Sequence, residues 1–121
     1  MLSSSSPSLV EIVRDAALEK KAENVATLDL AGRTIVADHF VVASGRSTIQ
    51  NRAIADGIAQ AAEAAGFSVG RTEGYADGNW ILLDLGTVIA HVFTPEQRAF
   101  YNLERLWAQP AAVAGSAERG G

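Results

Sequence analysis

The residues best suited to acid–base chemistry in this chain are a histidine and an aspartate on one predicted β-hairpin. His91 lies diagonal to Asp84 there, and an imidazole beside a carboxylate can act as a general base with its orienting acid. Ser44 and Ser47, the nearest candidates for a nucleophile, belong to a different segment. We therefore favour a buried or interfacial His91 that is bonded to a nearby acceptor, and keep the acid–base pair as the alternative.

Metal-dependent transfer chemistry would need two or three carboxylates held close together. The acidic candidates are scattered along the chain: Asp29, Asp38, Glu73, Asp77 and Asp84. No two of them lie two positions apart on one strand, which is the usual way to aim a pair at one metal. The chain has no cysteine and only two histidines, His39 and His91, whereas zinc needs three or four ligands. We expect no metal site, no cofactor and no catalytic residues.

A third chemical option is an anion site in the segment from Ser44 to Thr48, between a predicted buried strand and the start of a helix. Free backbone N–H groups and the helix dipole favour an anion at such a position, and Arg46 and Ser47 would contact it. The segment has neither a P-loop nor a GxGxxG pattern. We interpret it as a tight turn with a helix cap, and retain a small nucleotide-binding transferase as the alternative function.

The least usual pattern is the predicted hairpin over residues 80–93, which is apolar on both faces. Gly86 and Thr87 separate its two strands, and a two-residue loop that begins with glycine suits a type II′ turn. This loop sets the register, so one face has ordinary core pairs: Leu85 with Val88, Leu83 with Ala90 and Ile81 with Val92. The other face has the pairs Trp80 with Phe93, Leu82 with His91 and Asp84 with Ile89. An exposed face should be polar, so we expect this chain or another molecule to cover it.

Four aromatic residues lie late in the chain: Trp80, Phe93, Tyr101 and Trp107. They are compatible with core packing between the hairpin and a last helix. They are equally compatible with a protein-binding patch, because tryptophan and tyrosine often dominate the binding free energy of interfaces. Composition alone leaves both interpretations open.

Capping patterns and apolar spacing predict the elements that position these residues. Ser8 and Glu11 form a capping box before a helix over about residues 9–21, and Ser47 and Gln50 form another before a helix over about 48–65. Gly66 suits the C′ position of the second helix. We predict strands over about residues 24–30, 40–43 and 67–73, then the hairpin, then a final helical segment that begins at Pro95. The strand–helix–strand unit implies a parallel crossover, so the expected fold class is α/β, with one mixed, roughly five-stranded sheet and flanking helices.

Length and composition predict a single domain in a chain of 121 residues, of which 48% are hydrophobic and 20% charged. We divide the chain into a flexible lead (1–8), an α/β domain (9–107) and a disordered tail (108–121). It has no apolar run of transmembrane length and no secretory signal, so we expect a cytoplasmic protein without a membrane partner. The net charge of −4 argues against binding nucleic acid mainly through phosphates, and favours a small molecule or a basic protein as partner.

Four pieces of the sequence, taken together and in order, resemble the Iojap family, the bacterial ribosomal silencing factors. The pieces are ADHFVVASG at residues 37–45, RAIAD at 52–56, EG at 73–74 with WILLDLG at 80–86 and HVF at 91–93, and YNLERLW at 101–107. The resemblance extends from about Leu9 to Trp107, nearly the whole predicted domain. His39 departs from the pattern, because a tyrosine is usual there.

The resemblance implies a fold related to nucleotidyltransferases but without their catalytic carboxylates, and so a protein that is not an enzyme. It implies binding to large-subunit ribosomal protein fourteen, a basic protein on the intersubunit face, with no direct sequence-specific contact to nucleic acid. A factor bound there would block joining of the small subunit and lower translation when nutrients are short. The family is also often dimeric in isolation.

On this hypothesis the hairpin face and the last helix carry the partner-binding residues. Asp84 would meet a basic residue of the partner, and the others would contribute mainly apolar contact. The expected set is Trp80, Leu82, Asp84, Ile89, His91, Phe93, Tyr101 and Leu103.

Overall fold

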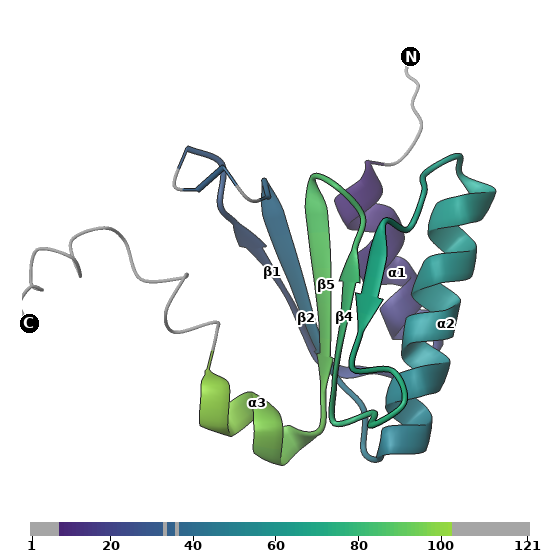
Figure 1. Ribbon diagram of the computed structural model, residues 1–121, viewed down its shortest axis with the longest axis vertical. Coiled ribbons are helices and arrows are strands. Elements are labelled where there is room, and N and C mark those ends of the chain that lie inside the picture. The colour runs from purple at the N-terminus through teal and green to yellow at the C-terminus, as the bar shows by residue number, and fades with distance from the viewer. Residues whose placement is uncertain (1–7, 33, 36, 103–121) are drawn as a thin grey trace, which may run out of the picture.

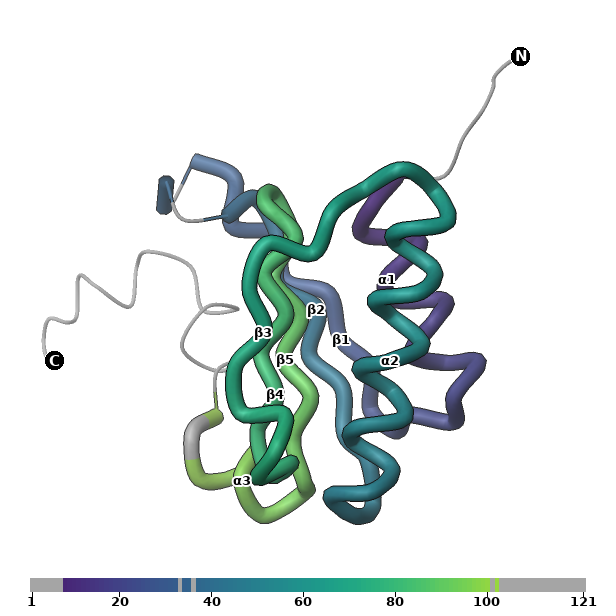
Figure 2. Tube along the Cα trace, turned by 45° about the vertical axis from the view of Figure 1, so that its right-hand side comes forward, coloured from purple at the N-terminus to yellow at the C-terminus, as the bar shows by residue number. Residues whose placement is uncertain are grey.

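The computed structural model of the chain (Figure 1) describes residues 8–32, 34–35 and 37–102. Within these residues five strands form one sheet, and two long helices, α1 and α2, pack on one of its faces. Figure 2 shows a short third helix, α3, on the other side of the sheet. The expected tail and most of the expected lead fall outside the described residues, so the predicted domain limits stay predictions. No helix in the described part of the chain is long and apolar enough to cross a membrane.

Helix α1 (Leu9–Glu19) begins with the predicted capping box. The Ser8 hydroxyl accepts a hydrogen bond from the Glu11 N–H at 3.4 Å, and the Glu11 carboxylate accepts one from the Ser8 N–H at 3.0 Å. The helix ends earlier than predicted, because Lys21 has a φ of +69°, which is incompatible with a continuing helix. Its buried residues are Leu9, Val13, Ala16 and Ala17.

Removing this cap should lower stability by about 1 kcal/mol, because the serine satisfies an N–H that is otherwise unpaired in the first helical turn. We expect Ser8→Ala to show the loss in urea unfolding followed by circular dichroism. Ser68→Ala, at an exposed position outside any helix or strand, is the matched control and should leave the midpoint unchanged. Equal midpoints for the wild type and Ser8→Ala would contradict a stabilising role of the cap.

Helix α2 (Thr48–Ala64) is capped by Ser47, whose hydroxyl accepts a hydrogen bond from the Gln50 N–H at 3.1 Å. The other half of the predicted capping box is not formed, because the Gln50 side chain is bonded to Arg46 and to the end of α1 instead. Gly66 follows the helix with a φ of +94°, as predicted for a C′ residue.

The sheet has the strand order β1-β2-β5-β4-β3. The strands are β1 (Glu23–Asp29), β2 (His39–Ser44), β3 (Arg71–Glu73), β4 (Trp80–Asp84) and β5 (Val88–Phe93). β2 and β5 run parallel, and the other neighbouring pairs are antiparallel. The predicted α/β class and the mixed five-stranded sheet are confirmed, while a likeness to nucleotidyltransferases stays a prediction.

The strand predicted over residues 67–73 is wrong in length, because only Arg71–Glu73 is a strand. Arg71 pairs with Asp84, at the end of β4, so residues 67–69 would have to pair beyond the hairpin turn. The crossover through α2 leads to this short edge strand, and β5 and β4 lie between it and β2. The parallel neighbour of β2 is therefore the second hairpin strand.

Two apolar cores lie on opposite faces of the sheet. The larger one is shared with α1 and α2 and includes Ile54, Ile58 and Ile81. The second lies on the other face, with Trp80 and Leu82 packed against its margin. Its buried members are Leu28, Leu30, Ala37, Phe40, Val42, Ile89 and Phe93.

Helix α3 (Pro95–Tyr101) begins at Pro95, as predicted. Arg98 joins it to the sheet, because its guanidinium donates hydrogen bonds to the Ser44 hydroxyl at 2.9 Å and to the Glu23 carbonyl at 3.5 Å. These contacts tie α3 to the end of β2 and the start of β1.

Candidate protein-docking site

The β4–β5 hairpin has the register that the sequence predicts. Its outward face pairs Trp80 with Phe93, Leu82 with His91 and Asp84 with Ile89. Gly86 has a φ of +92°, which a glycine-first turn requires, and the Leu85 N–H donates to the Val88 carbonyl at 2.9 Å. The turn therefore fixes which side chains share the outward face.

Trp80 is held on this face by a hydrogen bond and an aromatic contact. Its indole N–H donates to Nδ1 of His91 at 3.0 Å. Its ring lies against Phe93, with centroids 4.9 Å apart and an angle of 32° between the planes. The indole is therefore oriented from below by two residues of β5.

Exposure on the outward face differs between the two strands. Every residue of β5 is buried, whereas Trp80, Leu82 and Asp84 on β4 are partly exposed. A shallow pocket of about 260 Å³ opens there, lined by Glu73, Gly74, Trp80 and Leu82. The surface that a partner can reach in the free chain thus lies over β4 and β3.

The eight predicted partner-binding residues divide accordingly. Trp80, Leu82 and Asp84 lie at this surface. Ile89, His91 and Phe93 are only 5%, 4% and 0% exposed, so they support the surface from beneath. Tyr101 is the last residue of α3, and its side chain and Leu103 lie outside the described part of the structure.

The interpretation of His91 as bonded to an acceptor is wrong, because its Nδ1 accepts from the Trp80 indole. Nδ1 must then be unprotonated, so Nε2 carries the proton of the neutral imidazole. Burial lowers the pKa of His91 from 6.5 to about 4, which keeps the ring neutral at physiological pH.

The alternative acid–base pair is not assembled in the described residues. Asp84 lies opposite Ile89, and its carboxylate accepts from the Gly86 N–H at 3.0 Å, inside the hairpin turn. No group of three or more His, Asp or Glu side chains in this part of the chain is placed to hold a metal ion.

The loop before β4 is fastened to α2 by contacts that the sequence analysis missed. The Asn51 amide donates to the Gly78 carbonyl at 2.7 Å, and the Arg52 guanidinium donates to the carbonyl of Ala76 at 3.1 Å. Asn51 is fully buried three residues before Ile54, on the apolar side of α2. A polar residue on a buried helix face is the sequence feature that could have indicated such a contact.

One helical turn further along, the Tyr75 hydroxyl donates to the Asp56 carboxylate at 3.0 Å. This hydrogen bond raises the pKa of Tyr75, since the carboxylate stabilises the protonated hydroxyl. Arg52 and Asp56 both belong to the sequence piece at residues 52–56. That piece therefore holds the loop that leads into Trp80.

The candidate anion segment from Ser44 to Thr48 has its polar groups engaged inside the protein. The Arg46 N–H donates to the Gln50 side-chain oxygen at 2.8 Å, and the Arg46 guanidinium forms an ion pair with Glu23 at 2.9 Å. Ser47 caps α2. These contacts favour the interpretation as a turn with a helix cap over that of an anion site.

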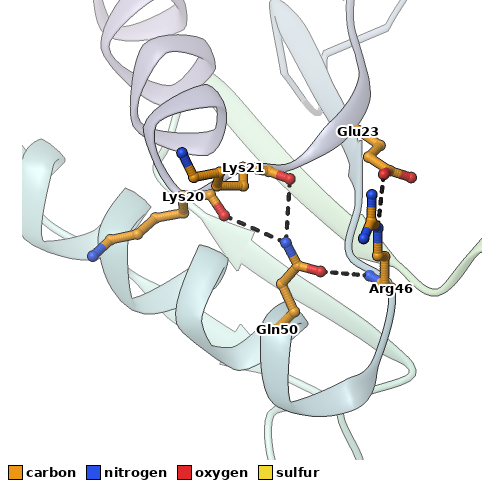
Figure 3. A network of polar contacts seen from close by, with 5 residues as sticks. All are labelled: Lys20, Lys21, Glu23, Arg46 and Gln50. Atoms are coloured by element: carbon orange, nitrogen blue, oxygen red, sulfur yellow. Dashed lines mark hydrogen bonds and ion pairs between the residues drawn. The ribbon is translucent and has the colours of Figure 1, made fainter.

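Figure 3 shows how the same network reaches α1. The Gln50 amide donates to the Lys21 carbonyl at 3.2 Å and to the Lys20 carbonyl at 3.5 Å. Gln50 thereby joins the end of α1 to the start of α2. The network has a structural function that needs no bound ligand.

Comparison with known proteins identifies the family. The sequence model of the family described as ribosomal silencing factor during starvation, RsfS, matches residues 3–119. The chain belongs to this family. The match covers all the residues that the structure describes, and therefore includes the whole β4–β5 hairpin of this family member.

Individual relatives agree in sequence and in fold. Ribosomal silencing factor RsfS of Halalkalibacterium halodurans is 39% identical over 109 residues, which are 90% of this chain and 93% of that protein. RsfS of Bacillus subtilis is 41% identical over 100 residues, which are 83% of this chain and 85% of that protein. A crystal structure of a Chromobacterium violaceum protein has a TM-score of 0.81 at 30% identity and covers 83% of both chains. The family resemblance predicted from the sequence is confirmed.

Proposed function

We propose that this chain silences ribosomes by binding the large ribosomal subunit and preventing the small subunit from joining it. Membership of the ribosomal silencing factor family over residues 3–119 is the observation that carries this proposal. The contact on the large subunit would be ribosomal protein fourteen, on the intersubunit face. The protein would act in the cytoplasm by occupying space, without catalysing a reaction.

The surface over β3 and β4 supports this proposal chemically. Trp80 and Leu82 offer partly exposed apolar contact, and Glu73 lines the same pocket with its carboxylate paired to Arg71 at 3.0 Å. An exposed aromatic and aliphatic centre suits a protein partner, and the net charge of −4 favours a basic one. In the free protein this surface would pair two copies, and the ribosome would compete with that homodimer.

The first test is co-sedimentation of the chain with purified large subunits, with Trp80→Ala beside the wild type. We expect the variant to bind about thirtyfold more weakly, because truncation of an aromatic anchor in an interface costs about 2 kcal/mol or more. Ile49→Ala is the matched control, since Ile49 is 73% exposed and lies on α2, on the opposite side of the sheet.

Three results would contradict parts of the proposal. Equal binding of Trp80→Ala and the wild type would keep the function and place the contact elsewhere. Binding without inhibition of subunit joining in a light-scattering assay would contradict the steric mechanism. Absence of wild-type binding would contradict the function itself, and would favour the nucleotide-binding alternative.

A further inference from the structure

The contact between Trp80 and His91 joins two strands diagonally on the outward face. Trp80 lies opposite Phe93, and His91 lies opposite Leu82, one pair further along the hairpin. The indole N–H reaches Nδ1 of His91 at 3.0 Å across this diagonal. Because a hydrogen bond weakens steeply when it bends, this contact restricts the direction of the indole N–H as well as its distance from β5.

His91 itself has little freedom to move. Its ring lies edge-on to Phe40, with centroids 4.6 Å apart, and parallel to Phe93, with centroids 6.0 Å apart. The residue is only 4% exposed. The imidazole is therefore a rigid acceptor, whereas the indole that it holds lies partly at the surface.

The second ring nitrogen of His91 is unfavourable for the stability of the core. Nε2 is buried and has no hydrogen-bond partner among the residues that the structure describes. A buried N–H without a partner is unfavourable, and an apolar side chain of similar size would avoid that penalty. The bond to Trp80 is the polar contact that this imidazole makes within the described residues.

We propose that His91 is a positioning residue, which holds the Trp80 indole in one orientation before a partner docks. This inference rests on the proposed function, in which Trp80 is the anchor of the docking surface. A side chain that is ordered before binding loses less conformational freedom on binding. Without the acceptor, the indole could turn about its side-chain bonds and meet the partner in several orientations.

A double-mutant cycle tests whether His91 acts through the indole N–H. We expect His91→Leu to weaken binding to large subunits about fivefold in the wild-type chain, the range of one ordered side chain or hydrogen bond. Trp80→Phe keeps an aromatic ring but removes the N–H donor. In the Trp80→Phe background, His91→Leu should change the affinity by less than about twofold, because the contact is already absent.

Stability and rescue separate positioning from a merely structural role. His91→Leu should leave the melting temperature unchanged or raised, since it removes a buried unpaired N–H. His91→Gln, whose side-chain oxygen can accept from the indole, should restore much of the binding. Ile58→Val is the control, because Ile58 lies in the core on the other face of the sheet; it should leave binding unchanged although it removes a buried methyl group.

Equal effects of His91→Leu in both backgrounds, or no effect in the wild type, would overturn the proposal. A fall in binding that only follows a fall in melting temperature would also overturn it. If the wild type does not bind large subunits, the proposed function fails separately. In that case the nitrogen-15 order parameter of the Trp80 indole tests whether His91 positions the ring. A value unchanged by His91→Leu would show that His91 does not fix the indole.

Discussion

Gly74→Ala should lower the free energy of unfolding by at least about 3 kcal/mol, because a strained backbone conformation and a steric overlap add their costs. Gly74 has a φ of +77°, a backbone conformation that residues other than glycine rarely adopt. A methyl group on this residue would also overlap the carbonyl oxygen of Trp80, which belongs to the backbone of β4 and cannot move aside alone. The substitution should therefore displace either the loop or the first residue of the docking strand.

Gly66→Ala is the matched control for this experiment. Gly66 has a φ of +94°, but no atom lies within 4 Å of a methyl group built on it. Gly66→Ala should lower the free energy of unfolding only by the cost of a positive φ at alanine, about 1 kcal/mol. Urea unfolding of the wild type and both variants separates the two contributions, and equal losses for Gly66→Ala and Gly74→Ala would contradict the overlap with the Trp80 carbonyl.

The hairpin register could be predicted because two local rules determine it. A two-residue turn at Gly86 and Thr87 leaves one register, and the alternation of side chains then assigns each residue to a face. The apolar character of both hairpin faces also predicted that the outward face would be covered, and within the described residues every residue of β5 is buried. What these rules predict is the set of residues on each face.

The contacts within a face could not be predicted in the same way. The bond between Trp80 and His91 depends on the side-chain rotamers of a diagonal pair, which periodicity does not determine. The bond from Asn51 to Gly78 joins residues 27 positions apart, and no local pattern sets that separation. The burial of Ile89, His91 and Phe93 was missed for a related reason, because it depends on which strands lie beside β5 in the sheet.

Acid should destabilise the fold through His91 by about 3 kcal/mol between pH 7 and pH 4, at 1.36 kcal/mol per pKa unit. Burial lowers the pKa of His91 from 6.5 to about 4 in the folded chain. Above pH 6.5 the imidazole is neutral in both the folded and the unfolded state, so protonation does not favour unfolding. As the pH falls toward 4, the unfolded chain binds a proton that the folded chain excludes, and the free energy of unfolding falls.

Urea unfolding of the wild type and His91→Leu across this pH range measures the effect. Carboxylates that titrate in the same range contribute to both curves, so the difference between the two isolates His91. The wild type should lose about 3 kcal/mol more than His91→Leu between pH 7 and pH 4. Parallel curves would contradict a lowered pKa of the buried imidazole.

Protonation of His91 should also release the docking residue. A proton on Nδ1 removes the lone pair that accepts the Trp80 N–H, so the indole loses its hydrogen bond when the folded chain is protonated. Trp80 fluorescence in a Trp107→Phe background should therefore change with a midpoint near pH 4, at the pKa of His91. Because this midpoint lies well below physiological pH, the indole should keep its orientation, and large-subunit binding should stay constant, between pH 6 and pH 8. A fluorescence midpoint near 6.5 would instead indicate an imidazole that is open to solvent and does not hold the indole.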